Sequence, residues 1–417
     1  MHDSPSHISK CPVHHNFNPL SPSFIEDPFA VLASLRHEAP VFYAPSIDYF
    51  VVTKYADIEA IFLDHETFSA SPAQVPLTPL VEEAAEILKR GGTKPQPSMV
   101  SIDPPEHARL RNPTVRAFTP KRVAMMEPRI RETVDKLLNA IDASAPFDLV
   151  AALTFSLPAT IIFSFLGFPE SEWMQLKEWG GNRSVLIWGK PTPEEQIHHA
   201  TNLSAYRNYM RSFVKEKMNN RDDSFTSALL AIHDENPEAL TAEEISSILY
   251  ALTFAGHETT NNLIANTIRH LLTAPARWNE VVANPSLIAG AVDETLRYDP
   301  SIPVWRRIAK RAVSIGGIEI PEGAKLFLWL AAAGRDASVF PEPEMYDMRR
   351  SNATKTLAFG KGIHYCLGAS LAKLEARLAL EALAKKFPTM RLVPEKKIPF
   401  SPNISFRSPQ ELWVQPI

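Results

Sequence analysis

The chain has 417 residues, of which 45% are hydrophobic and 22% are charged, so it has enough apolar material for a large core. Its formal net charge of −4 argues against nucleic acid as a partner, because phosphate recognition requires a basic surface. Two cysteines exclude a disulfide scaffold and suit a reducing cytosol. The apolar runs are too short to span a bilayer, so we expect a cytoplasmic protein.

The first hundred residues predict an arm followed by a small mixed region. Residues 1–25, which mix Ser, Pro, His and Asn, are expected to form an extended arm, and residues 26–417 to form a single domain. Helices are predicted over 28–37, 56–63 and 80–89, and strands over 41–43 and 49–53. Prolines and glycines interrupt residues 66–100, and a loop of that length in a compact domain is usually functional.

The stretch Asp103 to Phe118 carries two basic side chains at helical spacing. His107 and Arg111 are four residues apart, so a helix projects both from one face, whereas Arg109 points elsewhere. This pattern is typical of a solvated basic helix surface, and it also suits a pair of donors that grip one anionic group.

The middle of the chain predicts long helices joined by corners. They are expected over 122–141, 147–166, 171–181 and 194–218. The corner at 189–193, Gly-Lys-Pro-Thr-Pro, lies between the last two, and that helix pair is a candidate for a mobile lid.

A capping box at Thr241 and Glu244 starts a helix that runs to about residue 272. The run 256–262, Gly-His-Glu-Thr-Thr-Asn-Asn, has modest helix propensity and predicts a local distortion in the middle of that helix. A zinc-protease motif, His-Glu-x-x-His, fails because Asn261 stands where the second histidine is required.

The next predicted helix, 286–298, carries Glu294 and Arg297 three residues apart, which is more often surface decoration than a structural pair. Strands are predicted over 304–307, 313–315 and 318–320, an irregular segment over 340–350 and a terminal β-hairpin over 399–416.

The segment Phe359 to Gly368 reads Phe-Gly-Lys-Gly-Ile-His-Tyr-Cys-Leu-Gly and leads into a predicted helix over 369–382. Cys366 therefore lies where a glycine-rich loop enters a helix, and the amides and dipole of the helix N-terminus favour a thiolate. Such a thiolate suits an axial haem ligand, and it equally suits a nucleophile, so the segment alone leaves both readings open.

This segment closely resembles the haem-binding loop of the cytochrome P-450 superfamily, Phe-Gly-x-Gly-x-His-x-Cys-x-Gly, at every fixed position. The resemblance extends to Ala255–Thr259, to the Glu294/Arg297 pair and to the His107/Arg111 helix. It implies a mainly α fold with a small β-rich lobe, in which the haem lies between the long central helix and the cysteine loop. On this resemblance, we expect a soluble, bacterial-type, monomeric monooxygenase that carries haem b.

The resemblance also assigns roles to residues. Cys366 would be the iron ligand, Thr259 and Glu258 would handle oxygen and protons, and the remaining positions would contact the haem. The cofactor-binding set so implied is His107, Arg111, Ala255, Arg307, Phe359, Gly360, His364, Cys366 and Gly368. Arg306 competes with Arg307 for the same propionate.

The electrons are expected from a separate ferredoxin or flavodoxin with its reductase, because the chain has no complete dinucleotide motif and no cysteine cluster. Its docking site is expected on a basic patch near Cys366. The candidate patch residues are Arg109, Arg122, Lys361, Lys373 and Arg377.

The substrate is expected to be a small or medium hydrophobic molecule, because the residues beside the motifs are mainly apolar. The candidate lining is Leu252, Ala255, Ile302, Val304 and Trp305, with the loop 71–100 and the corner 189–193. The alternatives are a haem-thiolate sensor, which leaves Glu258 and Thr259 without a role, and a haem-free cysteine hydrolase, for which His364 is a poor base.

Overall fold

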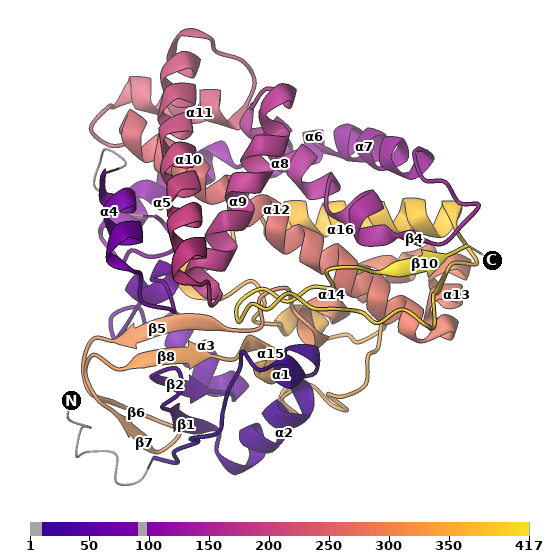
Figure 1. Ribbon diagram of the computed structural model, residues 1–417, viewed down its shortest axis with the longest axis horizontal. Helices are drawn as coiled ribbons and strands as arrows, with labels where there is room; N and C mark the ends of the chain where they lie inside the picture. Colours follow the sequence, from indigo (N-terminus) through magenta and orange to yellow (C-terminus); the bar gives the residue numbers. More distant parts are fainter. Residues whose placement is uncertain (1–10, 91–97, 417) are drawn as a thin grey trace.

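The computed structural model describes residues 11–90 and 98–416, and helices make up most of it (Figure 1). The longer helices are α1 (Pro22–Glu26), α2 (Phe29–Glu38), α3 (Tyr55–Leu63), α4 (Glu82–Arg90), α5 (Glu106–Ala117), α6 (Pro120–Met125), α7 (Glu127–Asn139), α8 (Leu157–Leu166), α9 (Trp173–Trp188), α10 (Pro193–Asn219), α11 (Phe225–Glu235), α12 (Ala242–Thr273), α13 (Pro275–Ala283), α14 (Ile288–Tyr298), α15 (Leu330–Ala333) and α16 (Ala369–Lys386). Short helical turns are η1 (Ser71–Gln74), η2 (Val150–Thr154), η3 (Glu170–Glu172), η4 (Pro285–Leu287), η5 (Ala353–Lys355) and η6 (Gly362–His364).

The strands gather mainly on one side of the molecule, away from most of the helices (Figure 1). They are β1 (Val41–Ala44), β2 (Tyr49–Val52), β3 (Phe68–Ser69), β4 (Phe147–Asp148), β5 (Trp305–Ala309), β6 (Val313–Ile315), β7 (Ile318–Ile320), β8 (Lys325–Leu328), β9 (Arg391–Leu392) and β10 (Trp413–Gln415). The largest sheet has the order β1-β2-β8-β5-β3, and β2 and β8 are its parallel pair, with Phe50 opposite Leu326. The expectation of a mainly α fold with a small β-rich lobe is confirmed.

Helix α12 is the centre of the helical part. Its capping box forms as predicted, because the Glu244 N–H donates to Thr241 Oγ1 at 3.2 Å and the Thr241 N–H donates to Glu244 Oε2 at 2.9 Å. At 1.5 Å per residue, its 32 residues extend about 48 Å, and α8, α10, α14 and α16 pack along it.

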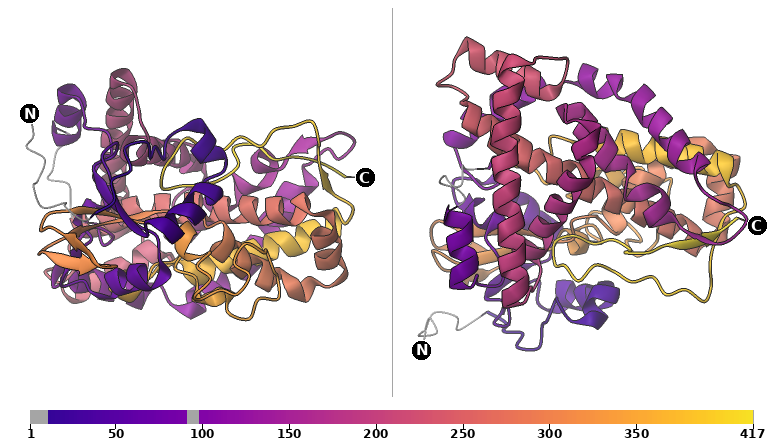
Figure 2. Two further views of the ribbon diagram at one scale, coloured as in Figure 1. Left: turned by 90° about the horizontal axis from the view of Figure 1, so that it is seen from below. Right: turned by 45° about the horizontal axis from the view of Figure 1, so that its top comes forward.

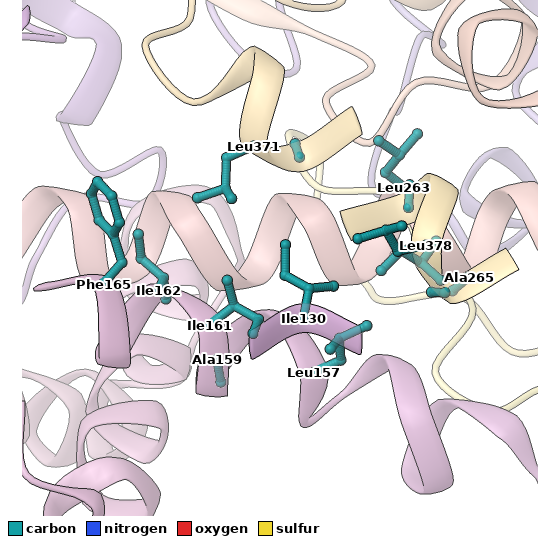
Figure 3. Close-up of a cluster of buried hydrophobic side chains, with 14 of the residues drawn as sticks. Ile130, Leu157, Ala159, Ile161, Ile162, Phe165, Leu263, Ala265, Leu371 and Leu378 are labelled. Atoms are coloured by element: carbon teal, nitrogen blue, oxygen red, sulfur yellow. The ribbon is translucent and has the colours of Figure 1, made fainter. Parts of the chain in front are cut away.

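The core around α12 is apolar and closely packed. Figure 3 shows Ile161 of α8 and Leu378 of α16 beside the central helix, which itself contributes Leu263. Each is at most 2% exposed. Burying a Leu or Ile side chain contributes about 1.5–3 kcal/mol, so this cluster fixes α16, and with it the end of the cysteine loop, against α12.

A second layer of helices lies over the N-terminal half of α12. Helix α10 lies beside α4 and α9 in Figure 1 and in the right view of Figure 2. Its own capping box joins Thr192, inside the predicted corner, to Glu195. These helices form the walls of the cavity described below.

The described part of the predicted arm packs onto the β-rich side. Phe17 and Phe24 are buried, and their rings lie 5.5 and 5.4 Å from the Trp329 ring. Within residues 11–90 and 98–416, no helix combines the length and the apolar character needed to cross a bilayer.

Several predicted boundaries are wrong. The helix predicted over 122–141 is two helices, α6 and α7, which meet at Met126 because Pro128 begins a new first turn. The helix predicted over 147–166 is a strand, a π-turn and then α8. Pro399 to Pro416 is not a hairpin: it has one isolated bridge, and β10 pairs with β4 and β9.

Helix α9 continues seven residues past its predicted end at Gly181. Position 180, inside this helix, requires a glycine because a Cβ there would be 2.7 Å from the His257 ring of α12. Gly180 thus marks a close helix crossing rather than a helix end, and the residues after it remain helical.

Candidate active site

The cysteine loop is a closed turn held by its own backbone. The Cys366 N–H donates to the Phe359 carbonyl at 2.9 Å, which brings the two ends of the loop together. Gly360 and Gly362 have φ of +70° and +67°, conformations that a side chain rarely adopts. A Cβ at Gly362 would also lie 2.8 Å from the Phe62 carbonyl, so the loop packs directly on α3.

Gly368 is the N-cap of α16 and is followed directly by Ala369. The backbone amides of both residues donate toward the Cys366 sulfur, as the position before a helix predicts. Burial nevertheless raises the pKa of the half-buried Cys366 thiol, and these hydrogen bonds and the charge of Arg111 only reduce that rise. A Cβ at Gly368 would meet no atom within 4 Å, so the space beside Gly368 is open.

A group of basic side chains gathers next to this loop. The His107 and His364 rings lie 4.3 Å apart, and the Nε2 atoms of both are buried without a hydrogen-bond partner. Arg111 of α5 donates from Nη2 to the Tyr365 carbonyl at 2.6 Å. Arg307 of β5 is 2% exposed.

The groups of this cluster act on one another's pKa values. Burial and, after it, the neighbouring charges of Arg307, His107 and Arg111 together lower the pKa of His364 to about 3, against the opposing charge of Asp103. Burial also lowers the pKa of Arg307 to about 10. Two arginines, Arg111 and Arg307, and one nearby carboxylate, Asp103, therefore leave this part of the site with a positive excess.

Arg306 and Arg307 point in different directions. Arg306 donates to the carbonyls of Val75 at 2.6 Å and Ala73 at 2.8 Å, so it holds the segment after η1. Arg307 donates to the Arg306 carbonyl at 2.8 Å and faces the His364 cluster. The geometry places Arg307, and not Arg306, with the basic group.

The middle of α12 faces the open space. Ala255 is exposed although it lies in the centre of a buried helix, and Thr259 Oγ1 donates to the Ala255 carbonyl at 2.8 Å. Helix α12 runs without interruption, so the predicted local distortion is wrong. Gly256 has a packing reason instead, because a Cβ there would lie 2.4 Å from Ile162 of α8.

Glu258 has a basic neighbour that the sequence did not indicate. Burial raises the pKa of Glu258, and the charge of Lys177 on α9 lowers it. Lys177 Nζ is buried without a hydrogen-bond partner and lies 2.9 Å from the centre of the Phe155 ring. Burial lowers the pKa of Lys177 to about 7, so Lys177 can change protonation near neutral pH.

The Glu294/Arg297 pair is a fully buried clamp rather than surface decoration. Arg297 Nη2 and Nε donate to Glu294 at 2.6 and 2.8 Å, and both side chains are 0% exposed. Arg350 joins them, with its Nε 3.1 Å from Glu294 Oε1, and the sequence analysis did not single it out. Arg297 also donates to the carbonyls of Gly334 and Pro343, which fixes the segment before the cysteine loop.

A cavity of about 360 Å³ lies toward the N-terminal half of α12. Its walls come from α4, α9, α10, α12 and the segment around η1. Of the predicted loop 71–100, the residues Ser71, Gln74, Val75, Pro76, Leu80, Leu88 and Ser98 contribute. Of the other predicted lining, Leu252, Ala255, Ile302, Val304, Trp305 and the corner 189–193 do not. Arg183 and Arg207, which the sequence analysis did not consider, do line it.

Comparisons with known proteins agree on one family. A family model described as Cytochrome P450 matches residues 40–284 and 280–412. The Vitamin D(3) 25-hydroxylase of Pseudonocardia autotrophica is 35% identical over 386 residues, or 89% of each chain. The structure of cytochrome P450 CREJ in complex with (4-ethylphenyl) dihydrogen phosphate is 40% identical, with a TM-score of 0.92, and covers 97% of this chain and 100% of that chain.

An intact type IV self-sufficient cytochrome P450 monooxygenase superposes with a TM-score of 0.93 at 34% identity. The match covers 96% of this chain and 52% of that chain. The likeness therefore extends over nearly the whole chain described here and about half of that larger protein.

Proposed function

The chain belongs to the cytochrome P450 family and is a haem-thiolate monooxygenase, and we propose that Cys366 is the axial ligand of its iron. The single observation that carries this assignment is the basic cluster beside the cysteine loop, in which the buried Nε2 atoms of His107 and His364 have no hydrogen-bond partner. When bound, the haem supplies the activation of dioxygen by two electrons, which puts one oxygen atom into an organic substrate and releases the other as water.

The residues present fit a haem. A haem carries two propionates, and buried carboxylates need donors. The orphaned Nε2 atoms of His107 and His364 and the cations Arg111 and Arg307 are such donors. Together they would hold the propionates, and binding of these anions would oppose the lowering of the histidine pKa values.

We infer that the haem is haem b, held without covalent attachment. A c-type haem requires a Cys-x-x-Cys-His motif, and the two cysteines of this chain are Cys11 and Cys366. Phe359, Gly360 and Gly368 would form the surface on which the ring lies at the cysteine side. The bound iron cation would hold the Cys366 sulfur as a thiolate, against the effect of burial on its pKa.

Thr259 and Glu258 would manage protons on the opposite side. The Thr259 hydroxyl donates a hydrogen bond to the Ala255 carbonyl, so its oxygen is left to accept a hydrogen bond from a water. Glu258, whose pKa burial raises, would deliver protons to that water and recover them from solvent. Lys177 would hold Glu258 in position through its charge.

A separate ferredoxin or flavodoxin is proposed as the electron donor, in the cytoplasm. Four of the five predicted patch residues are ion-paired: Arg109 with Glu244, Lys361 with Glu59, Lys373 with Asp293 and Arg377 with Glu381. Arg122 donates to the Asp223 carbonyl at 2.6 Å. If the donor docks on this patch, the electron-transfer rate should fall as the salt concentration rises, because salt screens the charges. A salt-independent rate would place the docking site elsewhere.

The similar proteins differ in what they bind. One is named for vitamin D(3), and another structure holds an aryl phosphate. We propose both classes as first compounds to screen, by the change that they cause in the absorption spectrum of the purified protein.

The test of the iron ligand is the absorption spectrum of the dithionite-reduced protein with carbon monoxide. We expect a strongly red-shifted Soret band for the protein and its loss in Cys366→Ser. Cys11→Ser is the matched control and should keep the band. A colourless protein, or a Soret band typical of histidine ligation, would remove the basis of the assignment.

A further inference from the structure

The cavity beside α12 contains an arginine that has no counter-ion. Arg183 of α9 is 2% exposed. Its Nη1 donates to the Tyr250 carbonyl at 3.1 Å, and its Nε is buried without a partner. In the part of the chain that the structure describes, no carboxylate lies within ion-pair distance of it.

A buried guanidinium without a counter-ion is costly, because arginine stays protonated and loses its hydration. Burial lowers the pKa of Arg183, and Arg207 lowers it further. Two aromatic rings reduce the cost only in part: the Arg183 guanidinium lies 4.5 Å from the Tyr250 ring centre and 5.4 Å from that of Phe254.

Arg207 of α10 brings a second positive charge to the same place. Its guanidinium lies 5.4 Å from the Tyr250 ring, so both arginines converge on that ring from different helices. Across residues 11–90 and 98–416, Arg207 also has no carboxylate within ion-pair distance. Two like charges repel each other, so an empty cavity leaves this arrangement electrostatically unfavourable.

The rest of the lining does not neutralise these charges. Glu243 is the carboxylate among the described lining residues, and Arg211 Nε already binds its Oε1 at 2.7 Å. Residues 91–97 of the chain contain no Asp or Glu. The other walls are largely apolar, with Leu80, Leu186 and Leu203 among them. The cavity thus combines a net positive charge with an apolar lining.

We propose that Arg183 and Arg207 bind the anionic group, a carboxylate or a phosphate monoester, of an amphiphilic substrate. This proposal rests on the proposed function and deepens it by naming the substrate class. A planar guanidinium fork matches both anions in bidentate geometry. The apolar body of the same molecule would lie along α12 toward Ala255 and Thr259.

Helix α12 sets the length of that molecule. Tyr250 marks the position of the anion, and Ala255 and Thr259 mark the reaction site five and nine residues further on. At 1.5 Å per residue these separations are about 8 and 14 Å. The carbon that is oxidised therefore lies about 8–14 Å from the charged group.

The test is isothermal titration calorimetry on the haem-loaded protein with octanoate, monooctyl phosphate and 1-octanol. These share one hydrocarbon chain and differ in the head group. We expect at least one anion to bind roughly tenfold or more tightly than the alcohol, since charge-assisted hydrogen bonds are the strong ones. The tighter of the two anions identifies the head group.

Variants assign the effect to the arginines. Arg207→Gln should weaken the preferred anion roughly tenfold and leave 1-octanol within about twofold. Arg183→Gln should do the same, and if its fold fails, Arg207→Gln decides alone. Glu243→Gln should tighten the anion, because it removes a negative charge from the cavity. Arg131→Gln, on the surface of α7, is the matched control and should change nothing.

Equal binding of the three ligands would overturn the proposal, and so would an Arg207→Gln variant that weakens all three alike. Calorimetry does not depend on turnover, and the carbon monoxide spectrum tests Cys366 separately. A failure of the anion site and a failure of the proposed function are therefore distinguishable.

Discussion

Replacing Glu294 by glutamine should destabilise the fold strongly and loosen the haem site. Glu294 accepts from Arg297 at 2.6 and 2.8 Å, from Arg350 at 3.1 Å and from the Asp347 N–H at 2.8 Å. Glu294 and Arg297 are 0% exposed, and Arg350 is 7% exposed. Glu294→Gln keeps the shape of the side chain but leaves two buried guanidinium groups without a counter-ion.

Removing one partner of a buried ion pair costs about 3–5 kcal/mol, a third or more of the total stability of many domains. The assay is urea unfolding of the haem-loaded protein, followed by tryptophan fluorescence and by the Soret band. Glu381→Gln is the matched control: Glu381 pairs with Arg377 on the surface, where an ion pair contributes about 0–1 kcal/mol. A loss below about 1 kcal/mol for Glu294→Gln would refute the reasoning that the clamp is a dry ion-pair network.

Three further predictions follow from single side chains. Thr259→Ala should lower product formed per electron pair by about tenfold or more, since positioned proton transfer contributes ~10²–10⁴, and Thr259→Ser should restore it; full coupling in Thr259→Ala would make that role wrong. Burial holds the pKa of Glu375 well above its ordinary range, so the native state binds the carboxyl proton more tightly than the unfolded state, and the free energy of unfolding falls as pH rises above the ordinary pKa. In urea unfolding, Glu375→Gln should therefore stabilise the protein more at alkaline than at acidic pH, and an equal gain at both would contradict this. Gly290→Ala places a Cβ 2.0 Å from the Met348 carbonyl and should lower the free energy of unfolding by about 1–3 kcal/mol. Gly181→Ala meets no atom within 4 Å and should not destabilise the protein. Equal thermal midpoints for the two variants would show that the backbone around Gly290 moves to make room.

The cysteine loop was predictable because its information is local. Gly360 and Gly362 need φ angles that only glycine adopts readily. Cys366 lies two residues before Gly368, the N-cap of the following helix. The capping box at Thr241 was predictable for the same reason, since its partners are three residues apart. The family and the monooxygenase function inferred from these motifs are confirmed.

The partners that lie far apart in the sequence were not predictable. Arg350 reaches Glu294 across 56 residues, and no local pattern distinguishes it from the neighbouring Arg349, which pairs with Glu280 on the surface. Arg183 was missed because two glycines before it looked like a helix end. Only the crossing of α9 over His257 explains why the helix needs a glycine at position 180 and continues beyond it.

In the proposed site, substrate recognition and chemistry would occupy different turns of α12. The Tyr250 carbonyl receives Arg183, and the Ala255 carbonyl receives the Thr259 hydroxyl. Because the core clusters of α8 and α16 fix this helix, the distance between the two turns does not depend on the substrate. Changes at Arg183 or Arg207 should therefore alter which molecules bind while leaving proton delivery at Thr259 unchanged. Changes at Thr259 should do the reverse, and this separation allows one catalytic centre to serve different substrates in different members of the family.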